Sequence, residues 1–157
     1  MDAGTRTLGK DTRCSIARTL EVVGEKWTLL IVREAFWGRT RFSEFRAALG
    51  IAPDVLTCRL ATLVEHGVLA RQAYREDGAR ERAEYVLTPA GRELKVVLAA
   101  LAQWGDEHRP TGFGPAALYV DPDTSERASL QFVRPDGSTL DPDDVSIVRG
   151  PGSVTAE

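Results

Sequence analysis

The side chains best suited to chemistry in this sequence are the hydroxyl, thiol and guanidinium groups of one segment, residues 51–67. Thr57 and Arg59 are the main candidates for contact with base edges, because an arginine can donate two hydrogen bonds to guanine, giving about 1–3 kcal/mol of discrimination. Alternatively, Arg59 contacts no base, and its charge only keeps the surface of the segment solvated or binds a phosphate. The whole set of candidate DNA contacts in this segment is Pro53, Asp54, Thr57, Cys58, Arg59 and Thr62.

Further arginines lie on both sides of this segment. Arg39, Arg41 and Ser43 surround the start of a predicted helix, where backbone N–H groups and positive charge suit a phosphate. Arg80 and Arg82 lie in a predicted hairpin and are expected to reach a phosphate or the minor groove. Alternatively, they pair with neighbouring carboxylates: Glu76, Glu81 or Glu84.

The two cysteines are interpreted as reduced thiols, since two in 157 residues do not make a disulfide framework. Cys14 is predicted in the first turn of a helix, where the helix dipole, Arg13 and Arg18 favour the reactive thiolate. Alternatively, Cys14 is a small buried residue at a dimer contact. A modified Cys58 would obstruct a groove-facing surface; otherwise it is an incidental exposed cysteine.

The sequence offers no pattern for catalysis or metal binding. His66 and His108 are isolated, with no second ligand at metal-binding spacing. There is no Ser-His-Asp order, glycine-rich phosphate loop or Cys-x-x-Cys pair. We therefore expect no enzyme activity, no metal and no cofactor.

The segment 51–67 has the pattern of an amphipathic helix. Leu56, Leu60, Leu63 and Val64 form one apolar stripe at helical spacing. Pro53 fits the first helical turn and Gly67 a left-handed end. The opposite face carries the following residues: Asp54, Cys58, Ala61, Thr62 and Glu65.

Three helices are predicted before it. The first covers 13–23, with Thr12 as its cap and Ile16, Ala17, Leu20 and Val23 as its inner face. The second, 26–36, is apolar nearly all round and should be buried. The third, 42–49, has Ser43 as its predicted cap. Only residues 50–53 separate the third helix from the fourth, which predicts a helix-turn-helix whose second helix enters the major groove.

A β-hairpin and another helix are predicted after Gly67. Residues 68–74 and 82–87 alternate partly, with Asp77-Gly78 as a hairpin turn, and this placement indicates a wing. Thr88 and Pro89 then start one long helix, whose apolar residues exceed what a small domain needs and indicate a partner helix: Leu94, Val97, Leu98, Leu101 and Trp104. The predicted fold class is α+β, mainly α: a winged helix-turn-helix with a small C-terminal β extension.

Charge separates the C-terminal part from the rest. Residues 1–112 hold 17 Lys+Arg and 15 Asp+Glu, whereas residues 113–157 hold 3 and 8. A local basic surface counts for more in DNA binding than the overall net charge of −3. We predict a flexible arm (1–12), a DNA-binding and dimerisation domain (13–110) and an acidic extension (111–157).

The extension is expected to form a small β-hairpin and then a disordered end. Its candidate strands are 117–120 and 129–133, Pro135–Ser138 is a turn, and disorder is expected after Gly150. No stretch approaches the ~18 apolar residues of a membrane helix, and the start lacks a signal-peptide pattern, so no membrane partner and a cytoplasmic location are expected.

Residues 14–105 resemble the HxlR-type winged helix-turn-helix transcription regulators of bacteria. The matching residues are Gly24 to Thr28, Leu30, Ile31, Gly38, Arg41, Phe42, Gly50, Ile51, Val55 to Thr57, Arg59, Leu60, Leu63, Gly67, Tyr85, Leu87 to Pro89, Gly91 and Trp104. The resemblance implies a homodimer paired through the first and last helices, with two recognition helices set for a palindromic operator. It also implies oxidant or electrophile sensing through a cysteine at the place of Cys14.

This chain departs from the family at several points. Cys58 stands where the family often has a long polar residue, and the wing tip lacks the proline common elsewhere. Some extended members end in a cysteine-bearing, zinc-ribbon-like hairpin, but this extension has no cysteine and no histidine after His108. We interpret it as a metal-free hairpin.

The sequence therefore predicts a DNA-binding transcriptional regulator, a repressor more readily than an activator, switched by thiol chemistry or a small ligand. A ligand site at the dimer seam would involve Trp27, Leu101 and Trp104; the simpler interpretation is core or interface packing. The alternative function is a ligand- or thiol-sensing module that acts through protein partners without sequence-specific DNA binding.

Overall fold

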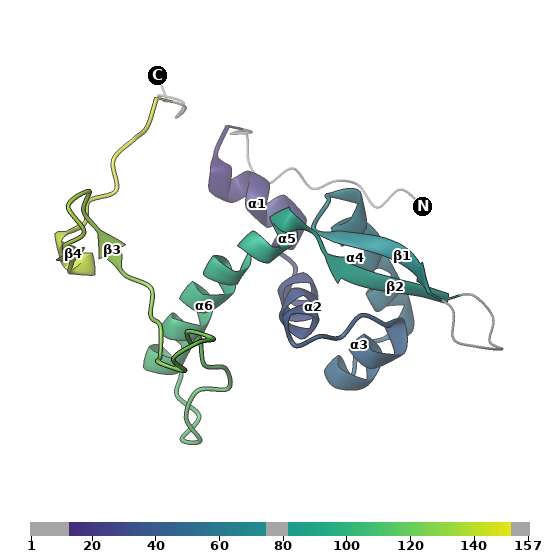
Figure 1. Cartoon of the computed structure of the whole chain (residues 1–157). Helices are drawn as coiled ribbons and strands as arrows, with labels where there is room; N and C mark the ends of the chain where they lie inside the picture. The colour runs from purple at the N-terminus through teal and green to yellow at the C-terminus, as the bar shows by residue number, and fades with distance from the viewer. Residues whose placement is uncertain (1–12, 75–81, 152–157) are drawn as a thin grey trace. The chain divides into compact units, whose positions relative to one another are not determined.

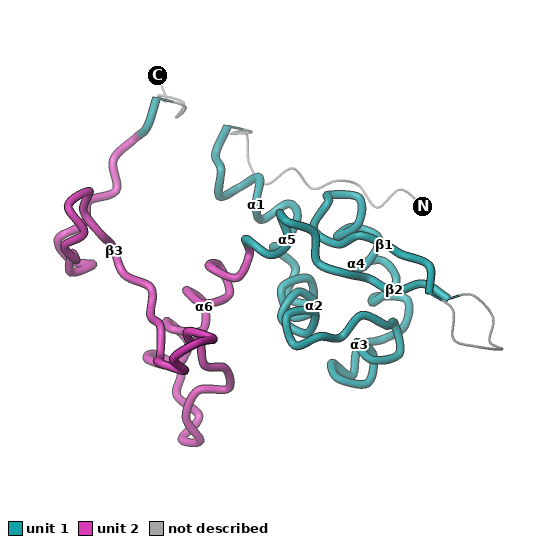
Figure 2. Tube along the Cα trace, viewed as in Figure 1, with its two compact units in different colours: residues 1–93, 150–157 teal, residues 94–149 magenta. Residues whose placement is uncertain are grey.

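The computed structural model describes residues 13–74 and 82–151, and the chain divides into two compact units (Figure 2). The first comprises residues 1–93 with 150–157, and the second comprises residues 94–149. Each unit is described by itself. The predicted division at residue 110, with its flexible arm, remains a prediction.

The first unit is a winged helix-turn-helix, as predicted (Figure 1). Its elements follow in the order α1 (Ser15–Val23), α2 (Lys26–Phe36), α3 (Phe42–Leu49), α4 (Pro53–Glu65), β1 (Leu69–Tyr74), β2 (Arg82–Leu87) and α5 (Pro89–Glu93). The predicted bounds of α2 and α3 are confirmed.

The core of the first unit lies around α2, which packs against α1, α3, α4 and β2. Ile31 and Val32 of α2 and Phe45 of α3 are completely buried. From α4, Leu56, Leu60 and Leu63 are at most 1% exposed. Burying a leucine of this kind contributes about 1.5–3 kcal/mol, so this apolar stripe fixes which face of α4 remains outside.

The turn between α3 and α4 has the predicted geometry. Gly50 has a φ of +61°, a left-handed conformation that glycine adopts without a Cβ clash. Ala52 is extended, and Pro53 occupies the first turn of α4, where its missing N–H has no helical partner. Gly67 has a φ of +68° just after the helix, and the chain turns into β1.

The wing is an antiparallel pair in which Leu69 lies opposite Leu87 and Tyr74 opposite Arg82. A short segment before α3 adds to it: Arg41 forms a bridge with Glu84, and the Tyr85 N–H donates to the Thr40 carbonyl at 2.7 Å. The predicted Asp77-Gly78 turn lies outside the described residues. The backbone before α3 is thereby joined to the sheet.

The predicted caps of α1 and α3 are wrong, although the bounds of α3 are as predicted. Helix α1 begins at Ser15 with Cys14 at its N-cap, and its predicted inner face is only partly covered: Val23 is buried, whereas Ile16 is 71% and Leu20 44% exposed. Helix α3 begins one residue before Ser43, with Arg41 at the N-cap. The helix start is fixed by Glu44, whose carboxylate accepts the N–H groups of Thr40 and Arg41 just before the helix.

The predicted last helix is interrupted. Thr88 caps α5 as expected, since its hydroxyl oxygen accepts the Gly91 N–H at 3.0 Å. The Thr88 hydroxyl also donates to the Gly67 carbonyl at 2.6 Å, which ties the helix start to the end of α4. Helix α5 ends at Glu93, and α6 (Lys95–His108) begins after Leu94.

The second unit holds α6, β3 (Phe132–Val133), β4 (Thr139–Leu140) and the 3-10 turn η1 (Pro142–Asp144). The predicted turn at Pro135–Ser138 is confirmed, and it joins β3 to β4. The predicted strand 117–120 is wrong, because only Val120 bridges, to Arg127. The Asp121 carboxylate accepts the N–H groups of Asp123 and Thr124, which turns the chain back before a strand can extend.

Candidate nucleic-acid interface

The outward face of α4 carries small and polar side chains at helical spacing. The exposed residues on it are Asp54, Thr57, Cys58, Ala61 and Glu65, and Thr62 is partly exposed. The Thr57 hydroxyl donates to the Pro53 carbonyl at 2.8 Å, and the Thr62 hydroxyl donates to the Cys58 carbonyl at 3.1 Å. Each hydroxyl oxygen keeps acceptor capacity, and a threonine methyl group is of the type that contacts a thymine methyl.

Arg59 lies to one side of this face. Its side chain is 27% exposed, and its Nη2 lies 3.6 Å from Oε2 of Glu25, in the link between α1 and α2. The Arg59 Nε is buried, and no hydrogen-bond acceptor meets it in the described structure. Arg59 therefore has a local anionic partner, which the sequence pattern did not indicate.

The start of α3 brings together Arg41, Ser43 and Glu44. Ser43 is exposed, and the Arg41 guanidinium lies 4.5 Å from the ring centre of Tyr74 in the wing. Glu44 accepts the N–H of Thr40 at 2.9 Å and of Arg41 at 3.0 Å. These hydrogen bonds, with the charges of Arg41 and Arg39, hold the pKa of Glu44 below its ordinary value.

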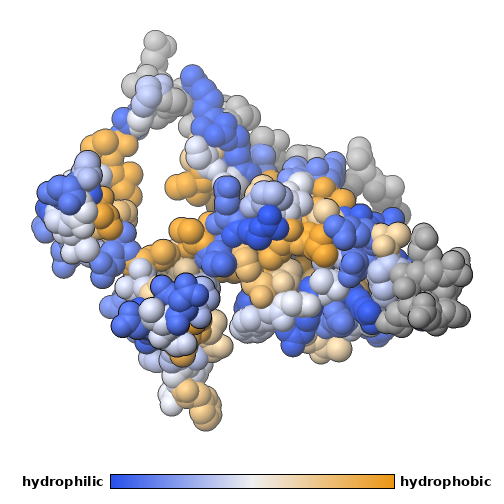
Figure 3. All heavy atoms as spheres, viewed as in Figure 1, coloured by the Kyte–Doolittle hydropathy of each residue, from blue (hydrophilic) through white to orange (hydrophobic). Residues whose placement is uncertain are grey.

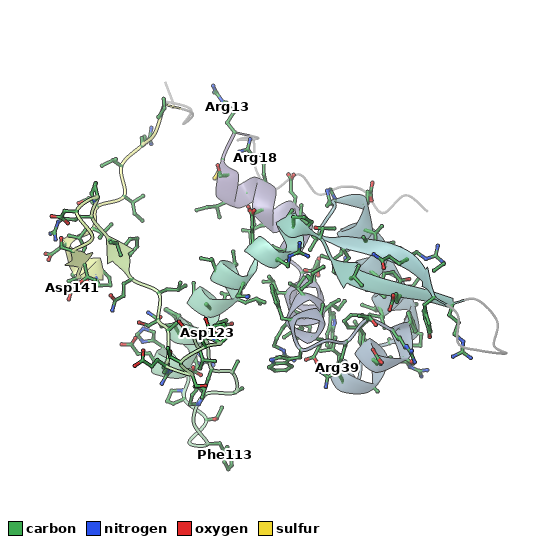
Figure 4. All side chains as sticks on the ribbon, in the orientation of Figure 1. Arg13, Arg18, Arg39, Phe113, Asp123 and Asp141 are labelled. Carbon is green, nitrogen blue, oxygen red and sulfur yellow. The ribbon has the colours of Figure 1, made fainter. Side chains whose placement is uncertain are left out.

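Arg39, labelled in Figure 4, lies in the link between α2 and α3. It contacts a buried acid. Its Nη1 is 2.5 Å from Oε2 of Glu34, whose side chain is 3% exposed. Arg33 binds the other carboxylate oxygen. Sequence reasoning missed Glu34, although a lone acid in an otherwise apolar buried helix was a signal that could have found it.

A shallow open hollow lies beside this cluster. It is lined by Trp37, Gly38, Arg39, Glu44, Ala47 and Ala48, with a volume of about 580 Å³. The exposed Arg46 lies on the same helix as the last three of these residues.

Only part of the predicted wing surface can be located. Arg82, the last residue of the register, is exposed, and so is Arg71 on β1. Arg80 lies outside the described residues. The wing contact of Arg80 and Arg82 with DNA therefore remains a prediction.

The two cysteines differ in setting. Cys58 is exposed on the outward face of α4, beside Thr57. Cys14 is partly exposed at the N-cap of α1.

The residues predicted at a dimer seam belong to both units. Trp27 in the first unit is partly exposed, with the Lys26 ammonium 5.1 Å from its ring centre. In the second unit, Leu101 is 52% and Trp104 59% exposed on α6, and the Trp104 ring lies 5.0 Å from that of His108. Figure 3 shows hydrophobic residues, in orange, at the surface of each unit. A ligand site formed by these residues remains a prediction.

The described residues form neither a metal-binding cluster nor a membrane-spanning helix. No cluster of three or more His, Cys, Asp or Glu residues could hold a metal ion. No helix within residues 13–74 and 82–151 has the length and apolar character needed to cross a membrane.

Comparison with known proteins decides the family. The HxlR-like helix-turn-helix family matches residues 22–112, from the end of α1 to beyond the end of α6. The chain belongs to the HxlR-like helix-turn-helix family. This confirms the resemblance noted from the sequence, and the family is one of transcription regulators.

Relatives with known sequences carry matching descriptions. The uncharacterised HTH-type transcriptional regulator Rv3095 of Mycobacterium tuberculosis is 50% identical over 101 residues, covering 64% of this chain and 63% of the relative. The match thus spans less than two thirds of that relative's length.

Solved structures support the fold. The crystal structure of PA1607 is 39% identical, with a TM-score of 0.76, and the match covers 90% of this chain and 98% of that protein. The redox regulator HypR in its reduced form is 31% identical, with a TM-score of 0.56, over 61% of this chain and 94% of HypR. The PA1607 match extends well beyond the helix-turn-helix and includes most of the C-terminal extension.

Proposed function

We propose that this chain is a transcriptional regulator that binds a palindromic DNA operator as a homodimer and represses transcription by occluding promoter DNA. The observation that carries the proposal is the outward face of α4, presented after a tight helix-turn-helix turn in a member of the HxlR-like family. In such motifs the second helix lies in the major groove and its outward residues contact base edges. Thr57, Cys58 and Thr62 would then face the bases.

Phosphate contacts would come from the elements around α4. Arg41 and Ser43 at the start of α3 and Arg82 on the wing are at least partly exposed and polar. Arg59 would reach DNA by leaving Glu25, which is itself 65% exposed. Since Glu25 is exposed and Arg59 partly so, water screens this pair; surface ion pairs contribute only about 0–1 kcal/mol, so the exchange is energetically accessible.

The proposed homodimer is supported by the exposed apolar faces of α1 and α6. Ile16 and Leu20 on α1, with Val96, Leu101 and Trp104 on α6, expose large hydrophobic surfaces. Residues 94–149 contain no buried side chain at all. A unit of that size without a core does not offset the conformational entropy of folding, so a second copy would supply the missing burial.

Thiol control is a further part of the proposal. It is favoured by the similarity to HypR, a redox regulator, and by the setting of Cys14 at the start of α1, a helix of the proposed dimer contact. A changed α1 contact would alter the spacing of the two α4 helices. The spacing of two recognition helices must match the half-site spacing of an operator.

The test is an operator-binding assay. The probes are a duplex of the DNA directly upstream of this chain's own gene and an unrelated duplex of equal length. The chain should prefer the upstream duplex, with strong salt dependence. Arg59→Ala should weaken that preference by roughly tenfold to a hundredfold if Arg59 bonds a guanine.

The matched control is Arg127→Ala, which removes an exposed arginine from the second unit and should bind as the unaltered chain does. Equal binding of both duplexes, with Arg59→Ala unchanged, would contradict the proposal. A stable protein partner in a pull-down, without DNA affinity, would favour the sensing module that acts through proteins.

A further inference from the structure

Glu34 is the only fully buried charged side chain among the described residues, and it has two cationic partners. Its Oε1 accepts from Arg33 Nη2 at 2.6 Å and from Nε at 3.1 Å. Its Oε2 lies 2.5 Å from Arg39 Nη1. A buried carboxylate costs several kcal/mol unless paired, so these two contacts account for its presence in the core.

The two arginines differ in what holds them. Arg33 is part of α2, and its guanidinium lies 5.0 Å from the ring centre of Trp37. Arg39 lies beyond the helix end, and its backbone N–H donates to the Glu34 backbone carbonyl at 3.2 Å. Glu34 thus contacts Arg39 at two places: its backbone carbonyl accepts the Arg39 N–H, and its carboxylate forms an ion pair with the Arg39 guanidinium.

Arg39 begins a short segment that carries the proposed phosphate contacts. The next residue, Thr40, accepts the Tyr85 N–H in the wing and donates its own N–H to Glu44 in α3. Arg41 follows, stacked on Tyr74. Arg39 therefore lies directly beside the point where α3 and the wing meet.

We infer that Glu34 is a positioning residue for DNA binding: its buried carboxylate orients Arg39 toward a phosphate of the DNA backbone. The inference rests on the proposed function. Arg39 is 38% exposed and has five N–H donors, more than one carboxylate oxygen accepts, so donors remain for a phosphate. One carboxylate between two guanidinium groups leaves a net charge of +1 in the cluster.

Simple electrostatics and the positioning role predict opposite effects of neutralising Glu34 on DNA affinity. Neutralising an acid makes the protein more positive, and a more positive surface binds a polyanion more tightly. The positioning role predicts weaker binding when Glu34 is neutralised, because Arg39 then loses its fixed direction. The sign of the change in DNA affinity therefore distinguishes the positioning role from simple electrostatics.

The experiment measures affinity for the upstream duplex over a range of salt concentrations. Each phosphate contact contributes about 0.9 to the slope of log affinity against log salt. Arg39→Ala should reduce the slope by about 0.9, and Glu34→Gln should reduce it similarly and weaken binding about tenfold. Combining the two substitutions should give the slope of Arg39→Ala alone.

Arg33→Ala is the matched control, since Arg33 pairs with the same carboxylate and is equally exposed, at 37%. It should leave the slope unchanged. Thermal melts establish that each variant is folded; if Glu34→Gln does not fold, the comparison of Arg33→Ala with Arg39→Ala decides.

An unchanged or steeper slope in folded Glu34→Gln overturns the inference about Glu34 but not the proposed function. Equal slope losses in Arg33→Ala and Arg39→Ala also overturn it. Absence of DNA binding by the unaltered chain overturns the proposed function and the inference with it.

Discussion

At the scale of single residues, the outward face of α4 is defined by what its neighbours bury. Leu56, Leu60 and Leu63 are buried, which leaves Thr57 and Cys58 outside. Arg59 is the residue whose assignment changed most, because its guanidinium lies near Glu25 and its Nε is buried. The Thr57 hydroxyl and the Cys58 thiol thus lie on the outward face as candidate DNA contacts, whereas Arg59 is held by an acid to one side of it.

A redox prediction belongs to this scale. Diamide should weaken binding to the upstream duplex by about tenfold, or about 1.4 kcal/mol, and dithiothreitol should restore it. Cys14→Ser should abolish the response, because the Cys14 thiol is partly exposed at the start of α1, where its oxidation would change the proposed dimer contact. Affinities of oxidised and reduced protein, measured by fluorescence anisotropy, test it.

Cys58→Ser is the matched variant and should keep the response. Loss of the response in Cys58→Ser with its survival in Cys14→Ser would assign the switch to the thiol on α4 instead. Survival in both variants would contradict thiol control.

At the scale of elements, close backbone contacts join the helices to the wing. The Thr88 hydroxyl reaches the Gly67 carbonyl, and the Thr88 N–H donates to the Val68 carbonyl at 3.1 Å. Gly91 packs on the same place: a Cβ there would lie 2.1 Å from the Val68 carbonyl oxygen. Helix α5 therefore sits on the start of β1 through a contact that excludes a side chain.

Gly91→Ala should lower the free energy of unfolding by about 1–3 kcal/mol, because the backbone of β1 or α5 must shift to admit the methyl group. The melting temperature should fall by roughly 3–10 °C. Differential scanning calorimetry measures both quantities.

Gly105→Ala is the control for that substitution. An added Cβ at Gly105 meets nothing within 4 Å, and alanine favours a helix interior by up to about 1 kcal/mol over glycine. It should melt at the same temperature or higher. A Gly91→Ala variant as stable as the unaltered chain would show that the contact with Val68 relaxes freely.

At the scale of the whole molecule, the distribution of burial is uneven. The first unit has a closed core around Ile31, Phe45 and Leu60, whereas residues 94–149 have no buried side chain. In the second unit, the Gln103 side-chain amide exchanges two hydrogen bonds with the backbone of Leu130, at 3.3 and 3.2 Å. The extension is thus tied to α6 by polar contacts, while the apolar side chains remain available to a partner.

Replacing Leu101 and Trp104 together by aspartate should weaken the proposed dimer by at least roughly a hundredfold, since each buried side chain contributes about 1.5–3 kcal/mol. Sedimentation equilibrium measures the change in the dissociation constant. Phe113→Asp, at a residue 97% exposed, is the control and should leave it unchanged. Monomer–dimer behaviour identical to that of the unaltered chain would contradict the role of α6.

Local sequence signals were sufficient for most of the first unit. Helices α2 and α3, the Gly50–Pro53 turn, the strands of the wing and the cap at Thr88 follow from apolar periodicity, glycine, proline and capping residues. These signals act over a few residues, so a single chain segment contains them in full. The prediction of a strand at 117–120 was wrong. The alternation there is weak, and the Asp121 carboxylate accepts the Asp123 N–H, which turns the chain instead.

Tertiary structure decided the partners of the charged residues. Nothing within the segment 51–67 shows that Arg59 meets Glu25, and no spacing pattern shows that Glu34 binds Arg39 from the core. Ion pairs depend on which charged ends converge after the apolar faces have packed, and that convergence joins residues from separate elements. The sequence alone therefore determined the winged helix-turn-helix and its outward face, whereas packing decided which arginines on and around that face are already held by acids.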